Sequence, residues 1–505
     1  MRILYLDLDA LNPSHLGCYG YHRNTSPTID EIASQGVRFD NMYCSDAPCL
    51  PSRTAFYQGR FGIHTGVVGH GGTTADPKPQ GAIRDFRSTY EEDSFPRQLQ
   101  KLGFHTAMIS PFGQRHAAHH FYAGFHEMHN TGQGGAEPAE VVQPVVEKWL
   151  RQNAARDNWY LHINFWDIHT NYRVPAGYGE PFADEPIAEW FTDELIEEQL
   201  LRAGPHSALD LGMYEDADPN EFPRVPKRIT DRASLTHWIN GYDTAIRYVD
   251  DHIARILALL REAGVEDEVA IIISADHGEN QGDLGIYGEH GTADQATCRI
   301  PFVVRWPGVQ GGAASEALCY HLDWAPTCLA LLGDEARALT PEVWDGASFA
   351  DCLRGRSAEH RQELVLSQCA HVAQRSVRFD QDGHRWLYIR TYHDGFHLFP
   401  EHMLFDLATD PHELNDLADA YPEVLREATW RMMAWHDRAM AKVVREHPSD
   451  VTDPLYKTLA EGGPLHARAD HPVGRPGDLR VYLRRLEQTG RGDAAALLRQ
   501  KYLAD

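Results

Sequence analysis

The sequence predicts an α/β fold, in which a large, mixed and mostly parallel sheet is sandwiched by helices and followed by a smaller antiparallel sheet. Strand-like and helix-like segments alternate over the first two-thirds of the chain, which is typical of a parallel sheet covered by helices. The β-branched run Val269–Ile273 fits a strand buried on both faces. After about Gly355 the pattern changes to short strands, which indicates the smaller C-terminal sheet.

The first and the longest elements are the clearest. Ile3–Leu8 is an apolar strand with Asp7 and Asp9 at its carboxyl end. Apolar residues at helical spacing predict a long helix over Thr236–Ala263, which leads into the strand at Val269. The other expected helices are Thr28–Gly36, Ser52–Gln58, Phe95–Leu102 and Val141–Asn153. The other expected strands are Val37–Tyr43, Gly103–Ile109 and Trp159–Phe165.

Three parts are expected along the chain. They are a catalytic α/β domain at 1–355, a small antiparallel subdomain at 356–430 and a helical C-terminal extension at 431–505. Gly177–Arg232 is acidic and rich in Pro and Gly, and we interpret it as an insertion at the rim of the site. Pro464–Asp505 predicts terminal helices that dock on the body or on another subunit, which is compatible with a homo-oligomer. The strands expected in the small sheet are Leu364–Ser367, Trp386–Arg390 and His402–Asp406.

Composition restricts the partners of the protein. The chain has 505 residues with 47 Lys and Arg against 73 Asp and Glu, and this formal charge of −26 argues against nucleic acid and anionic membranes. A local basic site must therefore attract any anionic substrate. No apolar run is long enough to span a bilayer and the N-terminus already forms a strand, so a cytoplasmic protein is expected. Most of the eight scattered cysteines are then expected to be reduced and buried.

Residues 49–53, Cys-Leu-Pro-Ser-Arg, form the most informative stretch. Pro51 suits the first helical position, and Gly59 can end the helix. Cys49 then lies beside free backbone N–H groups and the positive end of the helix dipole, with Arg53 one turn along. The sequence therefore predicts a thiol at a place that favours an anion.

Two acidic positions follow strands that are far apart in sequence. Asp9 follows the first strand, and Asp276 with His277 follows the Val269 strand. The carboxyl ends of parallel strands meet at one edge of a sheet, and the helix that carries Cys49 would face them. Carboxylates suit a hard cation such as Ca²⁺, or Mn²⁺ when a histidine nitrogen joins. A helix cap is the plainer interpretation of Asp276 alone, but the coincidence of these positions favours a metal site.

The chain resembles the type I sulfatases of the alkaline phosphatase superfamily over most of its length. Residues 49–53 match the C-x-P-x-R pattern that marks the cysteine oxidised to formylglycine in this family. Each remaining motif is weak alone, but all of them stand in the family's order. In chain order the motifs are Asp9 with Leu16–Gly20, Cys49–Arg53, Asp167–Thr170, Ser274–Glu279, Ile300–Phe302 with Arg305–Gly308, His321–Thr327, and Leu404–Leu407 with Asp410–Glu413.

The resemblance implies hydrolysis of a sulfate ester, of a small molecule or of a sugar, by formylglycine that a formylglycine-generating enzyme makes from Cys49. One hydroxyl of the hydrated aldehyde attacks sulfur and releases the alcohol, and the other is deprotonated and expels sulfate. One divalent metal, Ca²⁺ or alternatively Mn²⁺, would act with Arg53 and His169 to hold the sulfuryl oxygens. A second role for Arg53 is to orient the modified residue by hydrogen bonds. The metal ligands that the resemblance implies are Asp9, Cys49, Asp276 and His277.

The chain departs from the common family pattern near its basic residues. Asp9 is followed by Ala10 where many sulfatases have a second aspartate, and Tyr57–Gly59 replaces the usual leucine-threonine-glycine. The family's Gly-Lys-Trp-His is absent after the Gly103–Ile109 strand. In its place, Arg115 and His116 are the candidates for the substrate-binding cation and the acid.

A second family lysine is replaced by Glu289 in this chain. His290 is then the candidate leaving-group acid, because imidazole titrates near neutrality. The resemblance gives His169 a sulfate contact, and His64 and His70 on a glycine-rich stretch are expected to line the substrate pocket. The alternative for each histidine is a structural hydrogen bond within the fold.

Other functions compete with the sulfatase interpretation. The nearest alternative is a phosphonate monoester hydrolase or phosphodiesterase of the same superfamily, which resembles this chain in its single N-terminal aspartate and its Asp-His metal motif. Asp167–His169 and Tyr287–His290 favour a sulfatase. The intact set of candidate residues argues against a non-catalytic binding protein. A two-zinc phosphatase would need a serine or threonine nucleophile and further Asp or His ligands, which the sequence does not place.

Overall fold

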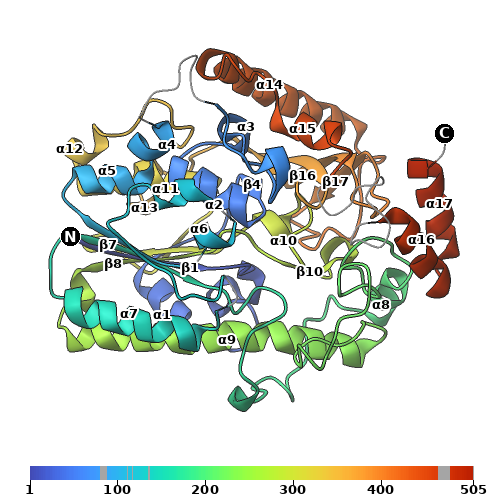
Figure 1. The fold of residues 1–505 in the computed structure, drawn as a ribbon, viewed down its shortest axis with the longest axis horizontal. Coiled ribbons are helices and arrows are strands. Elements are labelled where there is room, and N and C mark those ends of the chain that lie inside the picture. The colour runs from blue at the N-terminus through green and yellow to red at the C-terminus, as the bar shows by residue number, and fades with distance from the viewer. Residues whose placement is uncertain (80–87, 111, 117, 135–136, 465–477, 504–505) are drawn as a thin grey trace.

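An eight-stranded sheet runs through the middle of the molecule in a computed structural model that describes residues 1–79, 88–110, 112–116, 118–134, 137–464 and 478–503 (Figure 1). The strand order is β12-β2-β11-β8-β1-β7-β5-β6. From β8 to β6 neighbouring strands are parallel, whereas β11 is antiparallel to both β8 and β2. The strands are β1 (Arg2–Leu8), β2 (Val37–Phe39), β5 (His105–Ile109), β6 (Glu127–His129), β7 (Trp159–Phe165), β8 (Val269–Ser274), β11 (Phe302–Arg305) and β12 (Ala313–Ser315).

Helices cover both faces of this sheet (Figure 1). On one face lie α1 (Pro27–Gln35), α7 (Ala139–Asn153) and α9 (Arg232–Glu262). On the other lie α2 (Cys49–Gln58), α5 (Phe95–Lys101), α11 (Trp324–Leu332) and α13 (Ala350–Leu353). Every residue of β1, β7 and β8 is buried, because helices cover both sides of these central strands. The fold class predicted from the sequence is confirmed.

The register of the three central strands determines where the site forms. Asp7 of β1 is level with Asn164 of β7 and with Ser274 of β8. The residues that follow these strands therefore leave the sheet at the same edge, where open α/β sheets bind their ligands. Asp9 and Asp276 meet at this edge for that reason.

A second sheet of five strands has the order β17-β16-β15-β14-β4. Its strands are β4 (Asp46–Ala47), β14 (Glu363–Gln368), β15 (Ala373–Gln381), β16 (His384–His393) and β17 (His402–Asp406). The sheet is antiparallel except for the short edge strand β4, which precedes α2 and pairs with β14 in parallel. Because β4 belongs to this sheet, the small sheet supports the start of the helix that carries Cys49.

The C-terminal third contains four further helices, α14 (Pro422–Glu446), α15 (Pro454–Ala460), α16 (Leu479–Gln488) and α17 (Gly492–Leu503). α14 packs on the small sheet through Ala428 and Met432, and the boundary expected at 430/431 falls inside it. α16 and α17 pack with Ala203 of the insertion and with Phe396. The insertion is mostly irregular and includes α8 (Asp193–Gln199). Residues 465–477 of the predicted terminal stretch lie outside the described residues.

Some predicted elements differ from the structure. The segment predicted as one strand at Val37–Tyr43 is divided, because β3 (Met42–Tyr43) pairs with β13 (Cys319–Tyr320) and not with the main sheet. α2 begins at Cys49, so Pro51 occupies the third helical position and not the first. β15 was not predicted. Within the described ranges, no helix has the length and apolar content needed to cross a membrane.

The remaining short elements connect these layers. The helices are α3 (Gly62–Thr65), α4 (Thr89–Glu92), α6 (Phe112–Arg115), α10 (Gln295–Cys298) and α12 (Asp334–Arg337). The strands β9 (Asn280–Gln281) and β10 (Tyr287–Glu289) form a two-stranded ribbon after β8. This ribbon brings Glu289 and His290 back to the edge of the main sheet.

Candidate active site

Cys49 lies at the first residue of α2, a helix that is buried along its whole length. The helix is anchored by Ser52, whose hydroxyl donates to the Asp276 carbonyl oxygen at 2.5 Å and lies 3.0 Å from His321 Nε2. Gly59 ends the helix at φ +60°, where a side chain would meet the ring of Trp344. The start of α2 is therefore held firmly at the edge of the sheet.

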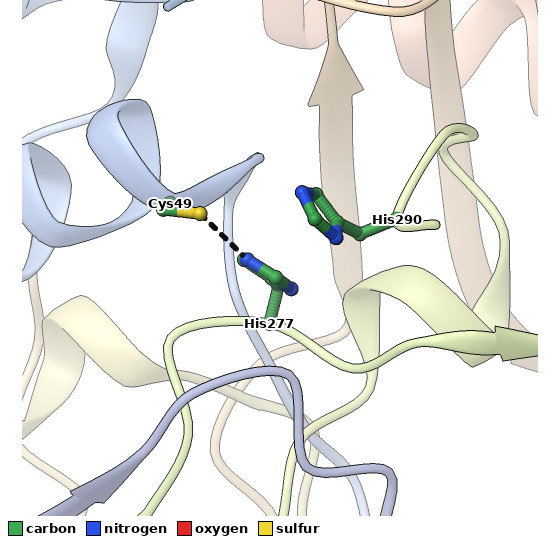
Figure 2. A group of neighbouring side chains, drawn as sticks. All are labelled: Cys49, His277 and His290. Carbon is green, nitrogen blue, oxygen red and sulfur yellow. Dashed lines mark hydrogen bonds between the residues drawn. The ribbon is translucent and has the colours of Figure 1, made fainter. Parts of the chain in front are cut away.

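Figure 2 shows the Cys49 side chain pointing at His277 across this edge. The Cys49 Sγ lies 3.1 Å from His277 Nε2. Burial, followed by the carboxylates of Asp9 and Asp276, raises the pKa of the Cys49 thiol well above its ordinary value. The unmodified thiol is therefore protonated in this environment, and a protonated thiol is a poor nucleophile.

The two carboxylates that follow β1 and β8 share one guanidinium. Arg53 Nη2 donates to Asp9 Oδ2 at 2.7 Å and lies 3.0 Å from Asp276 Oδ2, while its Nη1 contacts Asp7. Asp276 Oδ1 accepts from the backbone N–H groups of Ala10 and His277 at 3.3 and 3.0 Å. These contacts fix the positions of both carboxylates before any ligand binds.

The predicted ligand set fits a metal ion. Asp9, Cys49, Asp276 and His277 each offer one ligand atom, and these atoms lie within 4.8 Å of one another. Asp9 Oδ1 is buried and accepts no hydrogen bond from the described residues. Burial and the charge of Asp276 raise the pKa of Asp9 well above its ordinary value. Burial would also raise the pKa of Asp276, but Arg53 and His277 keep it below its usual range. A divalent cation would relieve the repulsion between these carboxylates.

Arg53 lies among the carboxylates of the metal site. Its side chain is 4% exposed, pairs with three carboxylates and lies over the ring of Phe112 at 4.5 Å. A guanidinium held in this way orients the carboxylates of the metal site. The predicted contact of Arg53 with sulfuryl oxygens stays a prediction, and this placement favours the orienting role.

Two of the candidate histidines lie beside His277. The His290 ring stacks on the His277 ring with 3.9 Å between centroids, and the His169 ring lies 5.2 Å from that of His290. Figure 2 shows His290 beside His277. His290 Nδ1 is 3.0 Å from Glu279 Oε2, and His290 Nε2 is 3.0 Å from Glu289 Oε1. Burial lowers the pKa of His169 to about 3 and that of His290 well below its ordinary value. Both imidazoles are therefore neutral at pH 7.

The other basic candidates, Arg115, His70 and His116, lie close to the same histidines. Arg115 is exposed and lies over the Trp166 ring at 4.0 Å, and its charge opposes the rise in the pKa of Cys49. The His70 and His116 rings lie 4.9 Å apart, and His70 Nε2 is 3.4 Å from the backbone nitrogen of Leu50. Burial, followed by the charge of Arg115, lowers the pKa of His116 to about 3. Arg115 is thus the exposed cation at the mouth of the site.

His64 lies away from this group. Its Nδ1 is 2.6 Å from Asp345 Oδ2 and its Nε2 is 3.1 Å from the Ala439 carbonyl oxygen. Nε2 joins α3 to α14 and Nδ1 joins α3 to the segment before α13, so both ring nitrogens already have partners within the fold. The structural alternative applies to this histidine.

Three residues near the site were not singled out in the sequence. His371, in the turn between β14 and β15, and His206, in the insertion, both approach Glu289. Arg173 is close enough to lower the pKa of His169. None of the three belongs to a local motif, so only the tertiary fold reveals them.

Comparison with known families agrees with this geometry. Residues 2–334 match the sulfatase family, and residues 285–436 match the family described as N-sulphoglucosamine sulphohydrolase, C-terminal. The N-acetylglucosamine-6-O-sulfatase of Bacteroides thetaiotaomicron is 23% identical over 487 residues, which cover 82% of this chain and 82% of the relative. The N-acetylgalactosamine-6-sulfatase of Homo sapiens is 26% identical over 348 residues, which cover 66% of this chain and 62% of the relative.

Solved structures share the fold at low sequence identity. A protein in complex with its substrate D-glucosamine-2-N,6-O-disulfate aligns with a TM-score of 0.66 and 18% identity, covering 87% of this chain and 98% of that one. The phosphonate monoester hydrolase of Silicibacter pomeroyi aligns with a TM-score of 0.65 and 18% identity, covering 88% and 96%. Because the family match spans most of the chain, this protein belongs to the sulfatase family and is a sulfuric ester hydrolase.

Proposed function

We propose that this sulfatase acts through formylglycine made from Cys49, beside one divalent cation, Ca²⁺ in the first instance and Mn²⁺ as the alternative. The observation that carries the proposal is the position of Cys49, at the start of a buried helix and within 4.8 Å of the ligand atoms of Asp9, Asp276 and His277. The cation would supply polarisation of the sulfuryl oxygens and of the attacking hydroxyl. The hydrated aldehyde would supply that hydroxyl and a second one whose deprotonation releases sulfate.

The surrounding side chains then have separate tasks. Arg53 keeps the carboxylates of Asp9 and Asp276 at their ligand positions. Arg115, the exposed cation, attracts the sulfate group into an otherwise strongly acidic protein. His169, as a neutral imidazole, and His70 are the candidates for contacting the sulfuryl group, since His70 lies beside the start of α2 and His169 beside His290. His290 and, in second place, His116 are the candidates for assisting the leaving oxygen, each by a hydrogen bond from a neutral imidazole.

The substrate class that we propose is a sulfated sugar. Support comes from the relatives that are named for N-acetylglucosamine and N-acetylgalactosamine sulfates, and from the aligned structure with a glucosamine disulfate. The insertion at 177–232 supplies His206 to the site, so it can contribute to sugar selection. A formylglycine-generating enzyme is the partner that this chemistry requires, and a cytoplasmic location remains a prediction.

Turnover of two aryl esters tests this function. On one formylglycine-containing preparation, kcat/KM should be higher for 4-nitrophenyl sulfate than for a 4-nitrophenyl phosphonate monoester. Cys49→Ala should abolish both activities, because it removes the nucleophile, whereas Cys18→Ala should retain them. A preference for the phosphonate would favour the alternative function, a phosphonate monoester hydrolase. The structural similarity to such an enzyme is the reason for this comparison.

A further inference from the structure

A second group of possible metal ligands lies next to the first. Glu289, the last residue of β10, is surrounded by histidines from three separate segments. Glu289 Oε1 is 3.0 Å from His290 Nε2 and 3.4 Å from His371 Nε2, and Glu289 Oε2 is 3.2 Å from His206 Nε2. Within the described part of the chain, the ion pairs of Glu289 join it to histidines.

The distances within this group match those between the ligands of a tetrahedral ion. Glu289, His290 and His371 each offer one ligand atom, and these atoms lie within 4.8 Å of one another. Ligands about 2.0–2.1 Å from a tetrahedral Zn²⁺ are about 3.3 Å from each other. The separations of 3.0 and 3.4 Å from Glu289 Oε1 bracket that value. Two imidazoles and a carboxylate leave the fourth position open, as in catalytic zinc sites.

The surroundings of His290 add a second, independent observation. Its other ring nitrogen, Nδ1, is 3.0 Å from Glu279 Oε2, and Glu279 Oε1 accepts from the Thr170 hydroxyl at 2.6 Å. A metal-binding histidine usually donates its second N–H to a carboxylate, which fixes the ring and its tautomer. His206, on the second oxygen of Glu289, orients that carboxylate in a similar way. Hydrogen bonds among Glu289 and its histidines would form without these further partners of the candidate ligands.

We propose that Glu289, His290 and His371 bind a second divalent cation, Zn²⁺, beside the site of Asp9, Cys49, Asp276 and His277. His290 belongs to this group and also lies within 4.8 Å of the ligand atoms of Cys49 and His277. The two groups of ligands therefore adjoin one another at His290. The second cation explains how an acidic side chain can occupy an anion-binding site, because the bound ion reverses the local charge.

The consequence for catalysis rests on the proposed function, but the binding of zinc does not. With the second cation bound, His290 would act as a ligand, and the cation would supply positive charge beside the leaving oxygen in place of a hydrogen bond from His290. The Zn²⁺ content can be measured without any turnover. The mass of the residue-49 peptide reports separately on the formylglycine.

The test is the zinc content of the full chain, stripped with a chelator, loaded with excess Zn²⁺, desalted and measured by elemental mass spectrometry. Wild type should hold two ions. Glu289→Gln and His371→Ala should each keep only the ion at the first site, and Asp276→Ala should keep only the ion at the second site. His206→Ala should keep both sites but weaken the second by about 10- to 100-fold. His402→Ala, a histidine of the small sheet that contacts Tyr388, is the matched control and should hold two ions.

Two results would overturn this proposal. One is a wild type that holds a single zinc ion, which Asp276→Ala removes. The other is retention of both ions by Glu289→Gln and by His371→Ala, with thermal unfolding showing that each variant is folded. Glu289→Gln has nearly the shape of the native side chain, so it keeps the test decisive if His371→Ala does not fold.

Discussion

At the scale of single residues, Asp276 contacts the backbone, Arg53 and the other candidate metal ligands. One oxygen accepts from two backbone N–H groups, and the other lies beside Arg53 and the remaining ligands. Asp276→Ala should therefore remove the first cation and lower kcat/KM by on the order of 10³-fold or more, because a charged ligand and its field are lost. Elemental analysis and activity on the same sample measure both effects.

The exposed carboxylate Asp267 offers a matched control for this variant. Asp267→Ala should keep full metal content and full activity, since the side chain lies on the surface far from the ligand group. Full occupancy of both cation sites in folded Asp276→Ala would refute the assignment of Asp276 as a ligand.

Which site residues the sequence could predict depends on their local context. Asp9, Asp276 and His277 directly follow apolar strands, and Cys49 starts a helix, so chain order and sheet geometry place them together. His371 stands in a turn between antiparallel strands, with no such context. The sequence alone leaves the role of Arg53 open, because a basic residue one turn from Cys49 has the same sequence signature whether it faces substrate or carboxylates.

Asp167 joins two elements of the main layer, since it follows β7 and accepts from the backbone N–H of Ala139 at the start of α7 at 2.9 Å. Its second oxygen is buried without a hydrogen bond from the described residues, and burial raises the pKa of Asp167 to about 7. The folded state thus holds a proton more tightly than the unfolded chain does. Stability is therefore lost as pH rises from about 4 to about 7.

Asp167→Asn keeps an oxygen that accepts the hydrogen bond from the Ala139 backbone N–H, and it removes the titratable carboxyl group. The stability that the variant gains over wild type should be about 3 kcal/mol larger at pH 8 than at pH 5. Denaturant unfolding at pH 5, 6.5 and 8 measures the difference, with Asp267→Asn as the exposed control. Parallel pH profiles for wild type and Asp167→Asn would show that the carboxyl is ionised without penalty.

Element boundaries were predictable where one face or both faces of an element are apolar. The fully buried strands β1, β7 and β8 and the periodic helix α9 agree with the sequence pattern to within a few residues. β15 was missed because its alternating sequence, Ala373–Gln381, contains Arg375 and Arg378 on buried positions. Arg375 is paired with buried Asp453, a compensation that no local pattern reveals.

At the scale of the whole molecule, the C-terminal helices hold the insertion in place. Arg491 pairs with Asp210 at 2.7 Å, both side chains are at most 1% exposed, and Arg485 and Tyr482 contact the same carboxylate. Removing one partner of a buried pair leaves an uncompensated charge. Arg491→Ala should therefore destabilise this contact by about 3–5 kcal/mol.

Hydrogen exchange measured peptide by peptide would detect the loosening, as faster exchange in 177–232 and in α16 and α17. Arg499→Ala, which removes an exposed pair with Glu487, is the control and should leave exchange unchanged. Unchanged exchange in Arg491→Ala would mean that apolar packing alone holds the insertion.

The overall architecture was predictable because strand–helix alternation leaves few arrangements for a parallel sheet. The docking of the terminal helices on the insertion was predicted only in general terms. It depends on Asp210 meeting Arg491, and these residues are joined by tertiary contact and not by any pattern along the chain. The expected parts at 1–355, 356–430 and 431–505 also share elements, since β4 belongs to the small sheet.

The state of residue 49 tests the central claim most directly. In protein produced with a formylglycine-generating enzyme, mass spectrometry of the tryptic peptide Phe39–Arg53 should show the aldehyde, and sulfatase activity should rise in proportion to the aldehyde fraction across preparations. A fully active preparation in which this peptide carries only unmodified Cys49 would contradict the account.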